Sequence, residues 1–156
     1  MKRLAKSEYL SNLTSLQLSD NDIGSDGIEY IANSSTFSNL TYLGLSFNYI
    51  DYAFSYLCDS EYLENLTGLN LDVNFLGDKQ LIEFAKSSNF PKLTTLSLEN
   101  NNLSDKGVKA LIASPYWKQL TALDLSCNVL SRTMIQQIES TFKGRVSLFG
   151  NKEENI

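Results

Sequence analysis

The chain of 156 residues contains no histidine, and this absence excludes several kinds of chemistry. Ser-His-Asp and Cys-His catalysis both need an imidazole to carry the proton, and many metal sites are built on histidine nitrogen. The two cysteines, Cys58 and Cys127, are too few for a framework of disulfides. The sequence therefore predicts a non-enzymatic protein with no catalytic residue, no metal site and no cofactor.

An excess of basic residues and a long hydrophobic run are also lacking. There are 13 Lys and Arg against 18 Asp and Glu, so the net charge is −5 at neutral pH, whereas a nucleic-acid binder needs a basic face. No stretch approaches the roughly 18 consecutive apolar residues of a membrane span. The basic start of the chain is interrupted by Glu8 before any apolar run forms. We expect no nucleic-acid partner, no membrane partner, no signal peptide and a cytoplasmic location.

One motif, L-x-x-L-x-L-x-x-N-x-[IL], recurs along the chain. Its five full copies begin at Leu13, Leu40, Leu66, Leu93 and Leu120, and a partial sixth copy covers 146–151. The asparagines stand at 21, 48, 74, 101, 128 and 151, in steps of 27, 26, 27, 27 and 23 residues. The rest of each period places apolar residues at i, i+3 and i+4, which is one buried face of a helix. Each repeat is therefore predicted to be a short strand, a turn and a helix.

This motif resembles the leucine-rich repeat, and the helix in each period is similar to the ribonuclease-inhibitor-like subclass. The segment from Ala110 to Asn128, with Ser-Pro after an alanine-rich helix, looks most like bacterial members. The resemblance implies an α/β fold, a right-handed solenoid in a short horseshoe arc, with a parallel concave sheet and helices on the convex side. A single domain is expected over 1–151, followed by a polar tail at 152–156. The strands should centre near Leu16, Leu43, Leu69, Leu96, Leu123 and Ser147.

The recurring asparagine is predicted to be structural rather than a ligand site. Its amide group both donates and accepts, so it can satisfy backbone groups that the turn would otherwise bury without a partner. This role is expected for Asn21, Asn48, Asn74, Asn101 and Asn128. Cys58 aligns with alanines on the inner helix face, and Trp117 aligns with Phe37, Leu63 and Phe90. Burial in the core is the main expectation for both, with a reactive thiol as the alternative for Cys58.

The candidate binding surface lies where two repeats depart from the polar habit of the others. The positions on either side of the asparagine are acidic or amide residues in repeats one and four, but they are Phe47, Tyr49, Val73 and Phe75 in repeats two and three. With Tyr42 they could form one exposed apolar patch, the kind of patch that marks interaction sites. Acidic side chains at Asp72, Glu99 and Asp124 would rim this patch and favour a partner with Lys or Arg. The alternative is that these apolar side chains fold under the loop and pack.

Two functions follow from these features. The first is a non-catalytic protein–protein interaction module that binds through its concave face and the adjacent loop ridge. The resemblance to bacterial members implies an effector, or the recognition domain of one, delivered into a host cell. The alternative is an assembly role, in which open solenoid ends pair with other copies to form a homo-oligomer. The chain indeed starts with only the helical half of a repeat, where Leu4, Ala5 and Leu10 align with Ile31, Ala32 and Phe37.

Overall fold

The computed structural model describes residues 1–151, apart from the side chain of Asp51, and the predicted tail at 152–156 lies outside the described residues. Its centre is one six-stranded sheet in the order β1-β2-β3-β4-β5-β6, with every neighbouring pair parallel. The strands are β1 (Ser15–Gln17), β2 (Tyr42–Gly44), β3 (Gly68–Asn70), β4 (Thr95–Ser97), β5 (Ala122–Asp124) and β6 (Val146–Ser147). All six predicted centres fall within these strands, so the predicted solenoid is confirmed.

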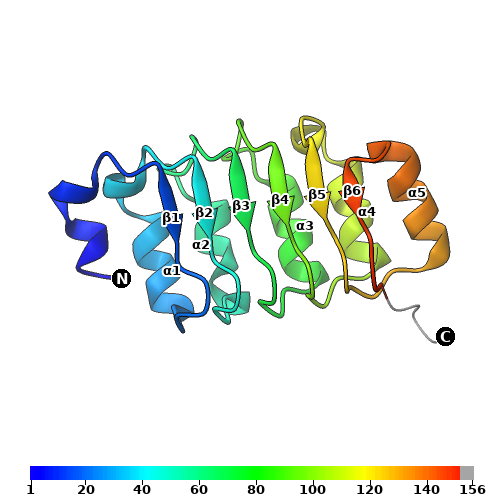
Figure 1. Cartoon of the computed structure of the whole chain (residues 1–156), viewed down its shortest axis with the longest axis horizontal. Coiled ribbons are helices and arrows are strands. Elements are labelled where there is room, and N and C mark those ends of the chain that lie inside the picture. Colours follow the sequence, from blue (N-terminus) through cyan, green and yellow to red (C-terminus); the bar gives the residue numbers. More distant parts are fainter. Residues whose placement is uncertain (152–156) are drawn as a thin grey trace.

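The α-helices form a second layer on one side of the sheet, because each parallel pair of strands needs a crossover (Figure 1). They are α1 (Gly24–Ala32), α2 (Phe54–Cys58), α3 (Asp78–Lys86), α4 (Asp105–Ala113) and α5 (Arg132–Phe142). Short 3₁₀ helices cover Leu4–Lys6, Glu8–Leu10, Ser35–Phe37, Asp51–Ala53 and Pro115–Trp117. Within residues 1–151, no helix combines the length and the apolar character needed to cross a membrane.

The core lies between the sheet and the helices. Leucines of the strands, such as Leu43 and Leu45, face helix residues such as Ile31 and Leu57, and all four are buried. Trp117 is buried as well and stacks on Phe84, with ring centroids 4.3 Å apart and planes 14° apart. The alignment of Trp117 with aromatic and leucine positions of other repeats therefore reflects a shared place in the core.

The recurring asparagines link neighbouring repeats through hydrogen bonds to the backbone. Asn101 is the fullest case: its Oδ1 accepts from the amides of Asn74 and Leu76 in the preceding repeat, and its Nδ2 donates to the carbonyls of Leu71, Leu98 and Glu99. Asn48 bonds in the same pattern, accepting from two amides and donating to three carbonyls of the turns beside it. Every buried polar group at these turns needs such a partner, since an unpaired one costs about 1–3 kcal/mol.

Two further side-chain ladders run across the repeats. Threonine at the second motif position donates to the carbonyl of the preceding threonine, as Thr67 does to Thr41. Serines at the end of the helical segment donate to a helix carbonyl of the preceding repeat, as Ser60 does to Ala32. The sequence analysis did not anticipate this second ladder, although the 26- or 27-residue spacing of Ser34, Ser60, Ser87 and Ser114 is visible in the sequence.

Candidate protein-binding surface

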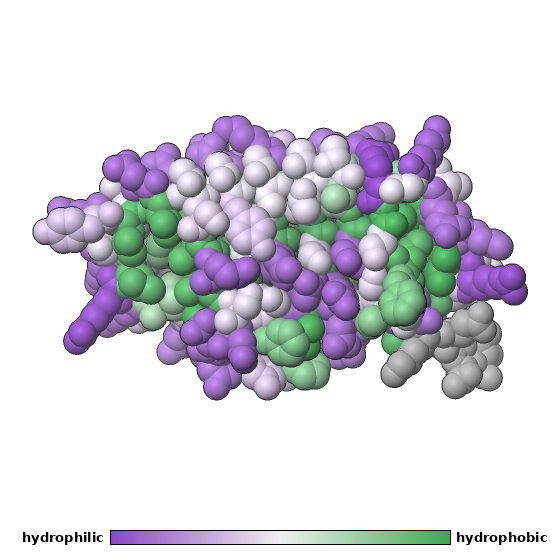
Figure 2. Space-filling model, viewed as in Figure 1, coloured by the Kyte–Doolittle hydropathy of each residue, from purple (hydrophilic) through white to green (hydrophobic). Residues whose placement is uncertain are grey.

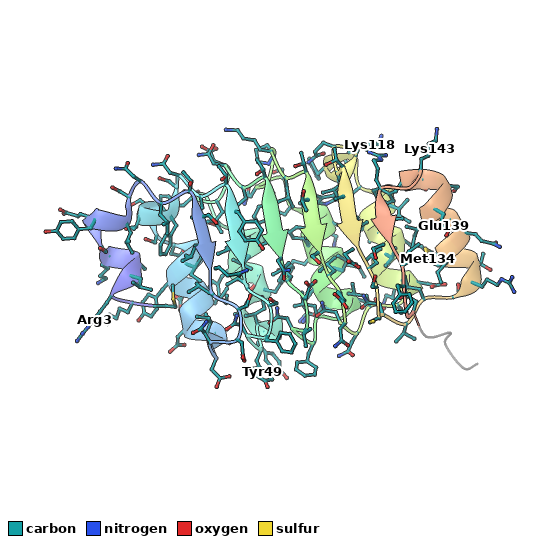
Figure 3. The ribbon with its side chains drawn as sticks, viewed as in Figure 1. Arg3, Tyr49, Lys118, Met134, Glu139 and Lys143 are labelled. Atoms are coloured by element: carbon teal, nitrogen blue, oxygen red, sulfur yellow. The ribbon has the colours of Figure 1, made fainter. Side chains whose placement is uncertain are left out.

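An aromatic ridge, made of Phe47, Tyr49, Val73 and Phe75, follows the carboxyl ends of β2 and β3. The asparagine between each pair points inward and is fully buried, so its two neighbours must turn outward. Phe47, Tyr49 and Phe75 are 52%, 61% and 56% exposed, and Val73 is half-buried. Figure 3 shows Tyr49 at the lower edge of the molecule, and Figure 2 shows apolar side chains at this margin among polar ones.

All four ridge residues have a left-handed backbone, with φ of 56°, 54°, 54° and 59° in chain order. The turn imposes this conformation, because Asp20 and Asp22 in repeat one and Asn100 in repeat four adopt it too. Asp and Asn tolerate left-handed φ, whereas a bulky L-residue pays about 1–2 kcal/mol for it and a β-branched one is an outlier. The ridge therefore holds residues that its own backbone disfavours.

The ridge continues from one repeat to the next through an aromatic stack. The rings of Tyr49 and Phe75 lie 5.7 Å apart between centroids, with their planes 15° apart. Offset stacks of this kind contribute about 0.5–1.5 kcal/mol beyond the buried area. The two repeats thus present one ordered apolar surface rather than separate side chains.

Tyr42 lies on the concave face rather than on the ridge. It is half-buried and its ring covers Gly68 of the next strand, where an added Cβ would come within 2.9 Å of Tyr42 Cδ2. The Gln17 side chain covers Gly44 in the same way. Side chains laid over glycines therefore fill the concave face above β1, β2 and β3.

Asp72 is largely engaged inside the sheet. Its Oδ1 accepts from Ser97 Oγ at 2.6 Å and from the amide of Glu99 at 2.8 Å, and its Oδ2 accepts from Asn70 Nδ2 at 2.8 Å. A carboxylate offers about four acceptor positions, so little capacity is left for a partner. Sequence reasoning placed Asp72 on the rim but missed these bonds, which depend on side chains of three different motif positions.

The other two acidic residues keep more of their capacity. Glu99 is exposed, and Asp124 is half-buried, with Oδ1 accepting from the amide of Ser126 at 2.8 Å. Glu99 follows β4 and Asp124 ends β5, so they lie beside the concave face rather than around the ridge. The structure thus brings the four ridge residues together and leaves Tyr42 and the acidic residues on the neighbouring face.

A hollow of about 480 Å³ opens above β4, β5 and β6, in contrast to the filled face above β1 to β3. Its floor includes the small side chains of Thr95 and Ala122, and Asp124 and Arg145 line it as well. Arg145 is the one charged residue at the third motif position, against Ser, Tyr, Gly, Thr and Ala in the other repeats. Sequence reasoning did not single it out, although this departure from the column was the available signal.

Thiol and metal chemistry find little support in the described part of the chain. Burial raises the pKa of the Cys58 thiol, and the nearby carboxylates of Glu83 and Asp59 raise it further, so the thiol stays protonated and unreactive. Across residues 1–151, no cluster of three or more Cys, Asp or Glu side chains could hold a metal ion.

Comparison with known proteins agrees with this architecture. A family model described as "Leucine Rich repeat" matches residues 9–32 and 91–112. The chain folds as a leucine-rich repeat solenoid. Among the similar solved structures is "Leiomodin-1 Actin-Binding Site 2 (ABS2)", with a TM-score of 0.51 and 14% sequence identity over 97% of this chain and 76% of that one. No curated protein matches the sequence. Leucine-rich repeat solenoids of this kind typically serve in protein interaction.

Proposed function

We propose that this leucine-rich repeat chain is a non-catalytic interaction module that binds a protein partner through the aromatic ridge and the adjacent concave face. The observation that carries this proposal is the ridge itself. Phe47, Tyr49 and Phe75 expose half or more of their surface and do so on a backbone that favours Asn or Gly. Exposure and strain both oppose these residues in the free protein, so a bound partner supplies the missing stabilisation.

The chemistry of the ridge suits such a partner. Aromatic side chains are the commonest anchors of protein interfaces, and the stacked pair Tyr49 and Phe75 is already ordered before binding. Glu99 and Asp124 add negative charge beside the ridge, which favours a partner surface with Lys or Arg. The neighbour titled as an actin-binding site has the same fold, which supports an interaction role for this chain.

The proposal has a finer form that rests on the sequence. Helices throughout the convex layer support the ribonuclease-inhibitor-like subclass, and the Ser-Pro segment after α4 is similar to bacterial members. Within this form, the chain is a bacterial effector or its recognition domain, and its partner is a host protein.

The test separates loss of binding from loss of folding. Phe47→Asn with Phe75→Asn removes two anchors and introduces residues that tolerate the left-handed backbone, so the variant should stay folded by circular dichroism. It should lose the proteins that the immobilised wild-type chain retains, with purified actin included as a defined probe. Tyr9→Asn with Tyr116→Asn is the matched control, because both tyrosines are exposed away from the ridge. Equal retention by wild type and the ridge variant would reject the ridge as the interface.

Self-association is a second candidate, favoured by the strand nearest the N-terminal side. Leu16 and Leu18 of that repeat are half-buried, whereas Leu43 and Leu45 in the next repeat are fully buried. A second copy stacked on β1 would cover this apolar edge. Light scattering over a concentration series decides between the two: a constant monomer mass rejects self-association, and a mass that rises with concentration and falls in Leu18→Lys supports it.

A further inference from the structure

The guanidinium of Arg145 is fixed in place at the rim of the hollow. Nε donates to the carbonyl of Phe142 at 2.8 Å, Nη1 donates to the carbonyl of Leu120 at 2.7 Å, and the group lies 5.8 Å from the centre of the Phe142 ring. Two of its five N–H groups are used, and the residue remains exposed. Within residues 1–151 it forms no ion pair. The result is a cation that is already ordered and has donors to spare.

The surroundings of Arg145 reinforce its positive charge. Lys118 and Lys143 project from the same upper edge of the molecule, at the end where β5 and β6 begin (Figure 3). The chain as a whole carries a net charge of −5, so this edge is a local exception. An arginine that binds a carboxylate in a two-pronged way, supported by neighbouring lysines, is a common anion site on a protein surface.

Negative charge lies at the opposite side of the same hollow. Asp124 is the one charged residue at the fifth motif position, and its Oδ2 makes no hydrogen bond within the described residues. It pairs in register with Ser147, two residues beyond Arg145 along the neighbouring strand. Glu99 lies two residues further along the strand direction and one strand farther across. With about 3.3 Å per residue and 4.8 Å between strands, Arg145 and Glu99 are about 16 Å apart along the face.

We propose that the hollow above β4, β5 and β6 binds an extended peptide segment of the partner, with a carboxylate at one end and a Lys or Arg side chain three to five residues away. The carboxylate binds Arg145, and the basic side chain binds Asp124 and Glu99. The small side chains of Thr95 and Ala122 leave room for the segment between the two ends. This inference rests on the proposed function and specifies the chemistry of the partner.

Nuclear magnetic resonance with defined peptides tests the inference, because it detects weak binding and locates it. The probes are acetylated and amidated Glu-Ala-Ala-Ala-Lys, its reverse Lys-Ala-Ala-Ala-Glu, and neutral Gln-Ala-Ala-Ala-Gln. We expect one charged peptide to shift the amide signals of Ser97, Ala122, Asp124 and Ser147, with the neutral peptide at least fivefold weaker. Equal affinity for the neutral peptide, or shifts that map outside the hollow, would overturn the inference.

Variants of the two charged ends complete the test. Arg145→Gln should weaken the charged peptide about fivefold to tenfold, but it also removes bonds that hold the backbone. Asp124→Lys avoids this ambiguity, because it should gain affinity for Glu-Ala-Ala-Ala-Glu relative to wild type, and a damaged fold cannot produce a gain. An Asp124→Lys variant with unchanged preference between the peptides contradicts the assignment.

The inference and the proposed function fail in different ways. Phe47→Asn with Phe75→Asn leaves the hollow intact and should bind the peptides as wild type does. If the peptides fail to bind while the ridge variant still loses its partner, only the hollow assignment falls. If the peptides bind and the ridge variant retains its partner, the ridge is rejected and the hollow stands.

Discussion

The ridge half of the molecule, around β2 and β3, and the hollow half, around β4 to β6, share one internal frame but differ in their surfaces. Asn48 and Asn101 make the same pattern of backbone bonds, although one carries the aromatic ridge beside it and the other does not. Tyr42 fills the concave face in the first half, whereas Ala122 leaves it open in the second. Inward positions are constrained by neighbours on both sides, so only outward positions are free to diverge into binding features.

The largest effect should come from the shared core. Leu71→Ala and Leu98→Ala each remove a buried strand leucine, one from each half, and each should cost about 2–5 kcal/mol of unfolding free energy through the cavity left behind. Because the frame is common, the two losses should agree within about 1 kcal/mol. Urea denaturation measures both, and a difference of several kcal/mol would show that the halves do not share one core.

The next effect distinguishes asparagines by their bonds. Asn101→Ala strands two amides and three carbonyls, whereas Asn74 accepts from the amide of Asn48 alone and donates to the carbonyls of Leu45 and Asp72. Each substitution should cost about 1–3 kcal/mol, with Asn101→Ala the larger. Denaturant melts of both variants check the order. Losses below about 0.5 kcal/mol would mean that water replaces these bonds freely.

The period of the sequence was enough to predict the frame. Because asparagines recur every 26 or 27 residues, the strands could be centred correctly from Leu16 to Ser147. The sequence also showed that repeat two lacks a residue after Ile50, and there the structure has a 3₁₀ turn, Asp51–Ala53, and a helix of only five residues. The start of the chain differed: the predicted helical half-repeat consists of two short 3₁₀ helices, Leu4–Lys6 and Glu8–Leu10.

The candidate site was harder to predict, because its character depends on backbone and cross-strand geometry. A left-handed φ at Phe47 or Val73 cannot be inferred from residues that disfavour it, and only the alignment with Asp20 and Asn100 hints at it. The engagement of Asp72 by Ser97 depends on the register between β3 and β4. Arg145 falls outside the full motif copies, so its column was visible while its place at the hollow was not.

A smaller effect isolates the strain in the ridge. Phe47→Ala and Phe47→Asn lose nearly the same contact area, but only Asn tolerates the left-handed φ of 56°. Phe47→Asn should therefore be more stable than Phe47→Ala by about 0.5–1 kcal/mol. Thermal or urea melts compare the pair. The same pair of substitutions at Thr95, an exposed strand position in the hollow, should lack this preference for Asn.

The smallest effect concerns the acidic residues, where stability and binding should separate. Glu99→Gln changes an exposed side chain without hydrogen bonds and should shift the unfolding free energy by less than about 0.5 kcal/mol. Asp72→Asn should cost about 1 kcal/mol, because its new amide faces the donating Nδ2 of Asn70. For binding the order reverses: Glu99→Gln should slow association with a basic partner and reduce its dependence on salt, whereas Asp72→Asn changes little. Stopped-flow association at two ionic strengths, beside urea melts, measures both. If Asp72→Asn slows association more than Glu99→Gln does, the partner reads the sheet carboxylate directly, and the internal bonds of Asp72 must open on binding.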